Sequence, residues 1–290
     1  NTNHMSPDDH YQNLKRIIAA VGGKAKRINV IMPFLYESRQ HKRSSRESLD
    51  CALALQELTH MGVDNIITFD AHDPRVQNAI PLSGFETVRP TYQFVKGLLD
   101  RYDDLIIDSD HMMAISPDEG ATERAVYLAN VLNLDMGMFY KRRDYTRVVN
   151  GRNPIVAHEF LGSSVEGKDV IILDDMISSG DSILDVAKQL KSRNAKRIFA
   201  AATFGLFTNG LDKFDEAYES GLIDGVLTTN LIYQTPELLS RPYYINCDMS
   251  KYVALMIDTL NHDGSISDIL DPSERIQVCV EEYKKAHGQL

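Results

Sequence analysis

Residues 170–182 read Val-Ile-Ile-Leu-Asp-Asp-Met-Ile-Ser-Ser-Gly-Asp-Ser, and they indicate the class of fold more clearly than any other part of the chain. A short apolar run bounded by polar residues is typical of a strand that is buried on both faces. The small polar residues after it form a turn, and residues 182–193 show the periodicity of a helix. A buried strand that leads directly into a helix is typical of α/β proteins with parallel sheets.

The same alternation extends in both directions from this segment. Towards the N-terminus it predicts helices from Ser6 and at 49–61, 91–102 and 122–132, and strands at 27–32, 65–70 and 112–116. Towards the C-terminus it predicts strands at 197–203 and 224–229 and a helix at 212–220. The stretch from Pro81 to Pro90 is rich in turn-forming residues. The expected fold class is α/β, with mainly parallel sheets flanked by helices.

Length and charge restrict the class of protein further. The chain has 290 residues, which suits two α/β domains, and a net charge of −10 from 31 Lys and Arg against 41 Asp and Glu. This acidic balance argues against a general nucleic-acid or membrane-surface binder. No apolar run approaches a membrane span and no secretion leader opens the chain. The three widely spaced Cys residues form neither a disulfide framework nor a zinc set, so we expect a cytoplasmic protein.

Two adjacent acids and a hydroxyl-rich turn follow the apolar strand. Asp174 and Asp175 end the strand, and the turn that follows contains Ser178, Ser179, Gly180, Asp181 and Ser182. Backbone N–H groups at the start of a helix, together with hydroxyl groups, can cradle a phosphate. The paired carboxylates suit a sugar diol, a metal-bound water, or both. The plain alternative is a capped helix that follows a strand with two solvated acids.

Cations are concentrated in two segments of this acidic chain. Five lie within 12 residues and four within eight, namely Lys141, Arg142, Arg143, Arg147 and Arg152, and Arg39, Lys42, Arg43 and Arg46. Such clusters favour small polyanions such as nucleotide and sugar phosphates, although a solvated basic loop would show the same pattern. Residues 144–153 are rich in Tyr, Thr, Asn and Gly, which suits a loop that closes over substrate and excludes water.

Two further strand ends carry polar residues. His72 follows a predicted strand between Asp70 and Asp73, and Asp118 precedes Gly120 in a Pro-Asp-Glu-Gly turn. Glycine at that place permits the close approach of backbone to a diphosphate. A single histidine is more often structural than a ligand, and such a turn is often no more than a turn.

Several motifs taken together resemble one family. Residues 174–182 are similar to the phosphoribosyl-diphosphate signature of the type I phosphoribosyltransferase fold. Residues 32–40 (Met-Pro-Phe-Leu-Tyr-Glu-Ser-Arg-Gln), 69–77 (Phe-Asp-Ala-His-Asp-Pro-Arg-Val-Gln), 116–120 (Ser-Pro-Asp-Glu-Gly) and 138–143 (Met-Phe-Tyr-Lys-Arg-Arg) resemble successive motifs of the ribose-phosphate diphosphokinases. The matches keep their order from about residue 26 to 270. A simple phosphoribosyltransferase would match only residues 174–182.

The resemblance implies transfer of the diphosphoryl group of ATP to the anomeric hydroxyl of D-ribose 5-phosphate, with Mg²⁺ as cofactor. It also implies a homo-oligomer, commonly a hexamer, that serves nucleotide, histidine and tryptophan biosynthesis. By the same resemblance Lys141 and Arg143 are catalytic, Arg39 and Gln40 bind ATP, and His72 and Asp118 bind the metal. The resemblance also implies that ribose 5-phosphate is bound by Arg143, Asp174, Asp175, Ser178, Ser179, Gly180, Asp181 and Ser182. Two alternatives to this activity stay open: a non-catalytic regulatory homologue of the enzyme, or a phosphoribosyltransferase that consumes the product.

The resemblance also gives expectations about domains. Residues 1–88 and 89–263 are expected to form two phosphoribosyltransferase-like domains, with the helices of 264–290 returning to the first. That first domain is expected to lack its opening strands and the acidic loop that in the family reaches a neighbouring subunit's ATP, and the chain, which begins at Asn1 without Met, is expected to be incomplete. Within residues 174–182, Ser178 replaces the usual third acid and Asp181 a common glycine.

Overall fold

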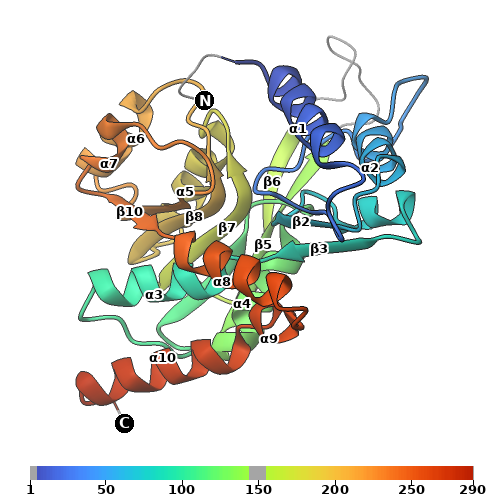
Figure 1. Ribbon diagram of the computed structural model, residues 1–290. Helices are drawn as coiled ribbons and strands as arrows, with labels where there is room; N and C mark the ends of the chain where they lie inside the picture. The colour runs from blue at the N-terminus through green and yellow to red at the C-terminus, as the bar shows by residue number, and fades with distance from the viewer. Residues whose placement is uncertain (1–4, 144–154, 290) are drawn as a thin grey trace. The chain divides into compact units, whose positions relative to one another are not determined.

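The chain divides into two units, one at each end of the sequence. The structure is a computed structural model that describes residues 5–143 and 155–289, and only the backbone of residues 141–143 and 155–158. The N-terminal unit comprises Asn1–Pro90 with Leu231–Tyr233, and the C-terminal unit comprises Thr91–Asn230 with Gln234–Leu290. Figure 1 shows the elements of both units.

The N-terminal unit is built on a three-stranded parallel sheet in the order β1-β2-β3. Its elements are α1 (Pro7–Val21), β1 (Asn29–Met32), α2 (Asp50–His60), β2 (Asn65–Phe69), the 3₁₀ helix η1 (Pro74–Ala79) and β3 (Gly84–Val88). Helix α1 begins as the sequence predicts: the Ser6 hydroxyl accepts a hydrogen bond from the Asp9 amide (3.1 Å), and Pro7 opens the first turn. Strand β3 was not expected, because short turn-forming segments flank it.

The C-terminal unit is built on a seven-stranded sheet in the order β10-β9-β8-β7-β4-β5-β6. All described pairs are parallel except β5 with β6. The strands are β4 (Met112–Ser116), β5 (Asp135–Arg143), β6 (Ile155–Leu161), β7 (Asp169–Ile177), β8 (Arg197–Gly205), β9 (Gly225–Thr229) and β10 (Tyr244–Cys247). The helices are α3 (Thr91–Arg101), α4 (Thr122–Leu132), α5 (Asp181–Lys191), α6 (Asp212–Glu219), α7 (Pro236–Leu239), α8 (Ser250–Asn261), α9 (Ser267–Leu270) and α10 (Ser273–Ala286).

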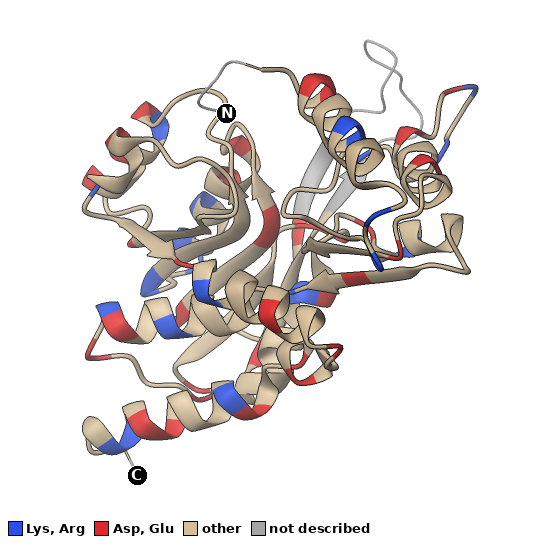
Figure 2. Cartoon of the chain, viewed as in Figure 1, with Lys and Arg blue, Asp and Glu red and all other residues tan. Residues whose placement is uncertain are grey.

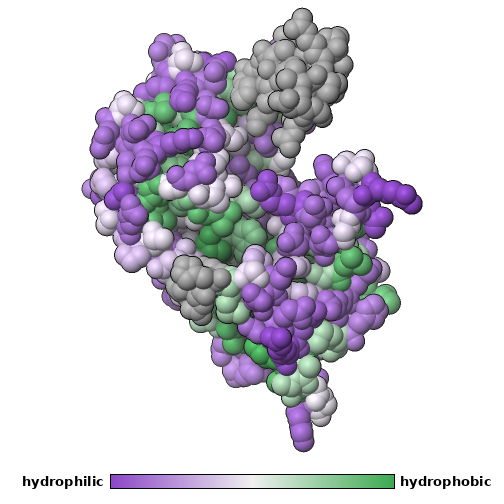
Figure 3. Space-filling view, turned by 90° about the horizontal axis from the view of Figure 1, so that it is seen from above, coloured by the Kyte–Doolittle hydropathy of each residue, from purple (hydrophilic) through white to green (hydrophobic). Residues whose placement is uncertain are grey.

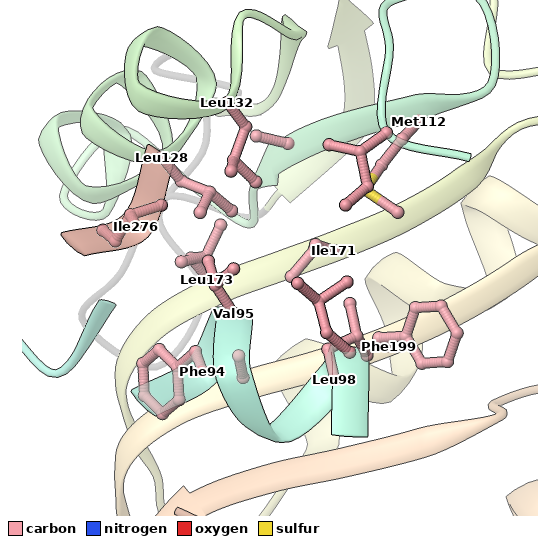
Figure 4. Close-up of a cluster of buried hydrophobic side chains, with 14 of the residues drawn as sticks. Phe94, Val95, Leu98, Met112, Leu128, Leu132, Ile171, Leu173, Phe199 and Ile276 are labelled. Atoms are coloured by element: carbon pink, nitrogen blue, oxygen red, sulfur yellow. The ribbon is translucent and has the colours of Figure 1, made fainter. Parts of the chain in front are cut away.

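Strand β7 is buried on both faces, as its apolar sequence predicts. Alternate side chains point to opposite faces of a sheet, so Ile171 and Leu173 enter one apolar cluster while Val170 and Ile172 enter another. The first cluster includes residues of α3, α4 and α10, and Figure 4 shows its side chains meeting over the sheet. The second includes residues of α5 and α6. The predicted α/β fold class is confirmed, with helices packed on both faces of a mainly parallel sheet.

The C-terminal helix packs on the C-terminal unit, so the expectation that residues 264–290 return to the first domain is not met. Figure 1 shows α10 alongside α3 and α4. Its Ile276 and Val280 are buried in the same cluster as the apolar face of α3. The Tyr283 hydroxyl donates to the carbonyl of Tyr102 (2.8 Å) and accepts from the amide of Leu105 (3.0 Å). These contacts at large sequence separation leave no signal in local sequence patterns.

Charged residues of both signs lie along the outer helices. Figure 2 shows Lys and Arg interspersed with Asp and Glu along α10, and the face drawn in Figure 3 is mostly hydrophilic with smaller apolar patches. Within the described residues, no helix combines the length and apolar character that crossing a bilayer would need.

Candidate functional site

The polar residues after β4 and β7 lie where open α/β sheets bind ligands. From β4 the chain adds β5 and β6 on one side, and from β7 it adds β8 and β9 on the other, so the strand order reverses between the adjacent strands β4 and β7. Ligands bind at the carboxyl ends of strands at such a reversal. Asp118 follows β4, and Asp174 and Asp175 lie near the end of β7. The sheet therefore brings these three predicted site residues to one edge.

The carboxylates at this edge repel one another. Asp175 is buried, with 4% of its surface exposed, and Asp174 is half-buried. Burial and the neighbouring Asp175 charge raise the pKa of Asp174 to about 8, and the charge of Asp118 adds to the shift. The Asp174 Oδ1 atom accepts a hydrogen bond from the Asp175 amide (2.8 Å). A group of acids with so much unfavourable charge suits a ligand that brings donors or positive charge.

Gly180 gives the turn after β7 its shape. It is the residue before the first turn of α5, and its φ of +84° lies in the left-handed region that favours glycine. A Cβ atom added there would collide with the ring of Phe214 on α6. Any side chain at this position would therefore be strained in its backbone and would also displace an aromatic ring of the core.

The start of α5 is suited to an anion. The first N–H groups of a helix have no partner within it, and the glycine that precedes α5 has no side chain to cap them. The Ser179 hydroxyl accepts from the Asp181 amide (3.4 Å), while Ser178 is held by its carbonyl, which accepts from the Thr208 amide (2.9 Å). Ser182 is exposed in the first turn of the helix. Hydroxyls and amides thus surround the turn where the sequence predicts a phosphate.

Asp181 is the acid in this turn that departs from the family pattern, and it has a partner. Its carboxylate forms an ion pair with the ammonium group of Lys213 from α6. The hydrogen bond that Lys213 donates to this carboxylate is the main reason why the pKa of Asp181 lies below its usual range. Lys213 offsets the charge that would otherwise repel an incoming phosphate. Lys213 is not among the predicted site residues, because no local pattern in the sequence marks it.

Asp118 shapes its own loop. Its Oδ1 atom accepts hydrogen bonds from the amides of Gly120 (2.9 Å) and Ala121 (3.3 Å), at the start of α4. Its carbonyl accepts from the Ser116 hydroxyl (2.6 Å). Part of the role of Asp118 is therefore to hold the turn between β4 and α4. This agrees with the alternative that the Pro-Asp-Glu-Gly segment is simply a turn.

A separate pocket lies within the N-terminal unit. It has a volume of about 620 Å³ and is enclosed by α1, the loop after β1 and Leu231–Tyr233. Arg39, a predicted ATP-binding residue, lines it and is exposed. Gln40 is the second predicted ATP-binding residue. Its backbone N–H donates to the backbone carbonyl of Glu37 (2.8 Å), and this bond closes the turn that contains Arg39.

His72 lies in a compact polar cluster of the N-terminal unit. The rings of His41 and His72 are 5.2 Å apart at an angle of 56°. The His41 Nε2 atom is 3.5 Å from Oδ2 of Asp73, and burial lowers the pKa of His41 while the Asp73 charge opposes the shift. Hydrogen bonds from Arg75 hold the pKa of Asp73 at about 2. His41 is not among the predicted site residues, although it directly follows Gln40 in the basic segment of residues 39–46.

The predicted catalytic pair lies at the end of β5. Lys141 and Arg143 pair with His158 and Ile155 of β6 through the backbone, with a register shift between Arg142 and Arg143. Their side chains, like Arg147 and Arg152, lie outside the described residues. Their roles stay predictions.

Comparison with known proteins defines the class first. The family model described as phosphoribosyl transferase domain matches residues 88–230, which includes the strands and the turn at the reversal of strand order. The family model described as N-terminal domain of ribose phosphate pyrophosphokinase matches residues 1–62. The C-terminal unit is thus of the phosphoribosyltransferase class. The second family model indicates which family within this class the chain resembles, the ribose phosphate pyrophosphokinases.

Relatives along most of the chain complete the assignment. A ribose-phosphate pyrophosphokinase of Shewanella oneidensis is 30% identical over 263 residues, covering 88% of this chain and 78% of the relative. One of Mycoplasma genitalium is 31% identical over 229 residues, or 78% of this chain. The chain belongs to the ribose-phosphate pyrophosphokinase family, and the resemblance noted in the sequence is confirmed.

The fold agrees with this assignment. A crystal structure of phosphoribosylpyrophosphate synthetase from Mycobacterium smegmatis matches with a TM-score of 0.73 at 24% identity, covering 88% of this chain and 78% of that chain. The chain spans just under two thirds of the length of two relatives, 65% of the Mycoplasma genitalium protein and 66% of the Mycoplasma pneumoniae protein.

Proposed function

We propose that this chain transfers the diphosphoryl group of ATP to the anomeric hydroxyl of D-ribose 5-phosphate, which yields AMP and 5-phospho-α-D-ribose 1-diphosphate. One observation carries the proposal: adjacent, mutually repelling carboxylates at the end of β7 lead into a turn that only glycine can form at the start of α5. Membership of the ribose-phosphate pyrophosphokinase family supports it.

The end of β7 is suited to the sugar phosphate. The 5-phosphate would accept hydrogen bonds from the amides at the start of α5 and from the hydroxyls of Ser179 and Ser182. The ribose hydroxyls would donate to Asp174 and Asp175, and these hydrogen bonds would stabilise the charged form of Asp174, which burial and Asp175 disfavour. Ser178 and Asp181 complete the turn, and Lys213 keeps the Asp181 charge from opposing the phosphate.

The transfer itself depends on positioning and on neutralising charge. The anomeric oxygen would attack the β-phosphorus directly, the bond from that phosphorus to the bridging oxygen of AMP would break, and no covalent enzyme intermediate would form. Lys141 and Arg143 would stabilise the charge that develops, while Arg39 and Gln40 hold the nucleotide. Exclusion of water from the closed site would protect ATP from hydrolysis.

The donor set fits magnesium as part of the proposal. The described residues contain no group of three His, Cys, Asp or Glu side chains that could enclose a metal by themselves. Magnesium in phosphoryl-transfer sites takes one or two carboxylates and fills its remaining positions with phosphate oxygens and water. Such an ion would favour the charged form of Asp174, which burial and the neighbouring Asp175 disfavour in its absence. His72 of the N-terminal unit and Asp118 of the C-terminal unit are each proposed as a magnesium ligand, and bound magnesium would neutralise charge on the phosphates.

An assay for AMP separates the proposal from its alternatives. The purified chain is incubated with ATP, ribose 5-phosphate and Mg²⁺, and AMP is measured with and without the sugar phosphate. The proposal expects AMP only when both substrates and Mg²⁺ are present. Binding of both substrates without AMP would identify a regulatory homologue. Release of pyrophosphate when the chain is instead incubated with 5-phospho-α-D-ribose 1-diphosphate and a free base would identify a phosphoribosyltransferase.

The Lys141→Ala variant tests the assignment of the catalytic pair. Turnover should fall by about 10²–10³-fold while the KM values for both substrates change little, because the lost interaction is made mainly in the transition state. Lys285→Ala, on the exposed side of α10, is the matched control. An unchanged turnover number would remove Lys141 from the mechanism.

Assembly and location complete the proposal. A homo-oligomer, as the family resemblance implies, would give a native mass that is a multiple of 32.7 kDa, and a hexamer is the expected form. Size-exclusion chromatography with light scattering tests this, and a single 32.7 kDa species would contradict it. We place the protein in the cytoplasm, which fractionation of the source cells would test.

A further inference from the structure

We infer that Arg193, at the end of α5, is a positioning residue for the proposed transfer reaction. Its guanidinium covers two aromatic rings at the point where the β5–β6 hairpin leaves the sheet. It thereby fixes the direction in which that hairpin carries Lys141 and Arg143. The inference rests on the proposed function for the role of that pair. Arg193 belongs to none of the motifs that resemble the family.

The sheet supports the β5–β6 hairpin along only part of its length. Within the described residues, β5 pairs with β4 at positions 135–138 and with β6 at positions 138–143. The two sets of pairs meet at Met138, so from Phe139 onward β5 and β6 form a ribbon of two strands. A ribbon of this kind is marginally stable by itself and twists more strongly than a wider sheet. Its direction therefore depends on side-chain contacts made where it leaves the sheet.

Two phenylalanine rings lie at that point. Phe139 and Phe160 are directly opposite each other in the β5–β6 register, with ring centroids 5.2 Å apart and planes inclined by 50°. Phe139 is 0% exposed in the apolar cluster that includes residues of α5, and Phe160 packs against the same cluster. The Phe160 ring also lies over Gly137, where an added Cβ would come within 2.5 Å of its Cζ atom. The first cross-strand pair beyond β4 is therefore held against the face of the sheet that α5 covers.

Arg193 contacts both rings from the end of α5. Its guanidinium carbon is 5.7 Å from the centroid of the Phe139 ring and 5.6 Å from that of the Phe160 ring, distances at which a cation is attracted to an aromatic face. Arg193 is half-buried, and partial exclusion of water strengthens this attraction. The guanidinium is itself fixed, because Nη1 donates to the carbonyl (2.8 Å) and to the side-chain oxygen (3.1 Å) of Gln189 on α5. The contact thus joins the hairpin to a helix.

Helix α5 links this contact to the proposed phosphate turn. The helix begins directly after Gly180, in the turn where the sequence predicts the phosphate, and it ends shortly before Arg193. Lys141 lies two residues beyond Phe139 on β5. Since a displacement of reacting groups by about 1 Å can cost about 10²-fold in rate, a small change in the direction of the ribbon is enough to lower turnover. Substrate binding should change little, because the proposal assigns it mainly to the turn before α5 and to the N-terminal unit.

The first experiment compares turnover in two variants at this position. Arg193→Ala removes the cation, and the turnover number should fall about tenfold while the KM values for ATP and ribose 5-phosphate stay within about twofold. Arg193→Lys keeps a cation that can lie over the rings, and it should bring the turnover number back to within about threefold of the wild-type value. A wild-type turnover number in Arg193→Ala, or equal losses in the two variants, would overturn the inference.

Arg275→Ala is the matched control for loss of such a contact elsewhere in the C-terminal unit. The guanidinium carbon of Arg275 is 4.9 Å from the centroid of the Tyr252 ring and 5.8 Å from that of the Tyr92 ring, and its Nη2 donates to the carbonyl of Asp268 (3.1 Å). Its loss should lower the urea midpoint, as Arg193→Ala does, and leave the turnover number within about twofold of the wild-type value. Equal losses of turnover in Arg275→Ala and Arg193→Ala would show a general effect of stability, and the inference would fail.

Hydrogen exchange separates failure of this inference from failure of the proposed function, because it needs no turnover. In Arg193→Ala the backbone amides of residues 139–143 and 155–161 should exchange about tenfold faster than in the wild-type chain, while those of β8 and β9 keep their wild-type rates. If the wild-type chain forms no AMP but this change occurs, the proposed reaction fails while the contact between Arg193 and the hairpin is confirmed. If AMP forms and exchange in the hairpin is unchanged in Arg193→Ala, the reaction stands and the inference fails.

Discussion

The ends of strands β7 and β1 hold the two candidate ligand sites, and they are built from different parts of the chain. At the end of β7 the ligand surface is mostly backbone: amides of α5, small hydroxyl residues and a glycine pressed against Phe214. At the end of β1 it is side chains, with aromatic rings and Arg39 around a pocket of about 620 Å³. A backbone site fixes the position of a small anion and tolerates no added atom. A side-chain pocket accepts changes that alter affinity.

The acidic residues of the two regions also differ in whether they have a partner. The acids after β7 crowd one another, and the pKa of Asp174 rises to about 8. The acids of the N-terminal unit have partners: Arg75 holds the pKa of Asp73 near 2, and Asp8 accepts from Tyr36. Paired acids stabilise the local structure, whereas crowded acids store an unfavourable energy that a ligand can relieve. Each of the following variants tests one part of this contrast.

The largest effect is expected for Gly180→Ala. The left-handed backbone and the collision with Phe214 together should lower the free energy of unfolding by about 3 kcal/mol and weaken binding of ribose 5-phosphate. Gly210→Ala is the matched control, because its φ is +78° but no atom lies within 4 Å of an added Cβ. It should cost about 1 kcal/mol. Urea unfolding measures both, and equal losses would show that Phe214 exerts no constraint.

The next effect concerns Asp174→Asn and pH. The native carboxyl has a pKa of about 8 and the unfolded one about 3.9. Between these values the folded chain binds the extra proton, so wild-type stability should fall as pH rises from about 4 to 8. The variant should lack this slope and be more stable at pH 8.5 by on the order of 1–2 kcal/mol, while binding ribose 5-phosphate more weakly.

Denaturant unfolding at several pH values checks this prediction. Asp185→Asn, at an exposed position on α5, is the control and should keep the wild-type slope. A wild-type stability that is constant from pH 4 to 8 would show that Asp174 titrates normally, and the crowding of charge would then not distinguish the β7 site.

The same contrast explains what the sequence could predict. Strand β7, its turn and α5 were predictable because the information is local: an apolar run, two acids and a glycine before a periodic segment. The partners of that turn were not, because Lys213 and Phe214 reach it from α6 through tertiary packing. His41 was missed for the same reason, since its neighbour His72 follows a different strand. Strand β3 and the docking of α10 also depend on contacts between distant segments.

A smaller effect is expected at the β1 site for Tyr36→Phe. The change removes the hydroxyl that donates to Asp8 (2.6 Å) and keeps the ring that stacks on Tyr11. Stability should fall by about 1 kcal/mol, the usual worth of one hydrogen bond. That bond raises the pKa of Tyr36 to about 12, so its contribution should be constant up to about pH 10 and disappear between pH 10 and 12. Tyr218→Phe, exposed on α6, is the control for unfolding in urea, and equal losses would contradict the prediction.

The smallest effect on stability is expected at the ion pair beside the β7 turn, where affinity is the informative measurement. Asp181 and Lys213 are both about half exposed, so Asp181→Asn should leave the urea midpoint unchanged. Since Lys213 already offsets the charge, this variant should leave the KM for ribose 5-phosphate within about twofold. Lys213→Ala uncovers the carboxylate beside the phosphate and should raise that KM about threefold, and the double variant should restore it. If Lys213→Ala has no effect, the Asp181 charge does not reach the phosphate, and the departure from the family pattern at this position carries no cost for binding.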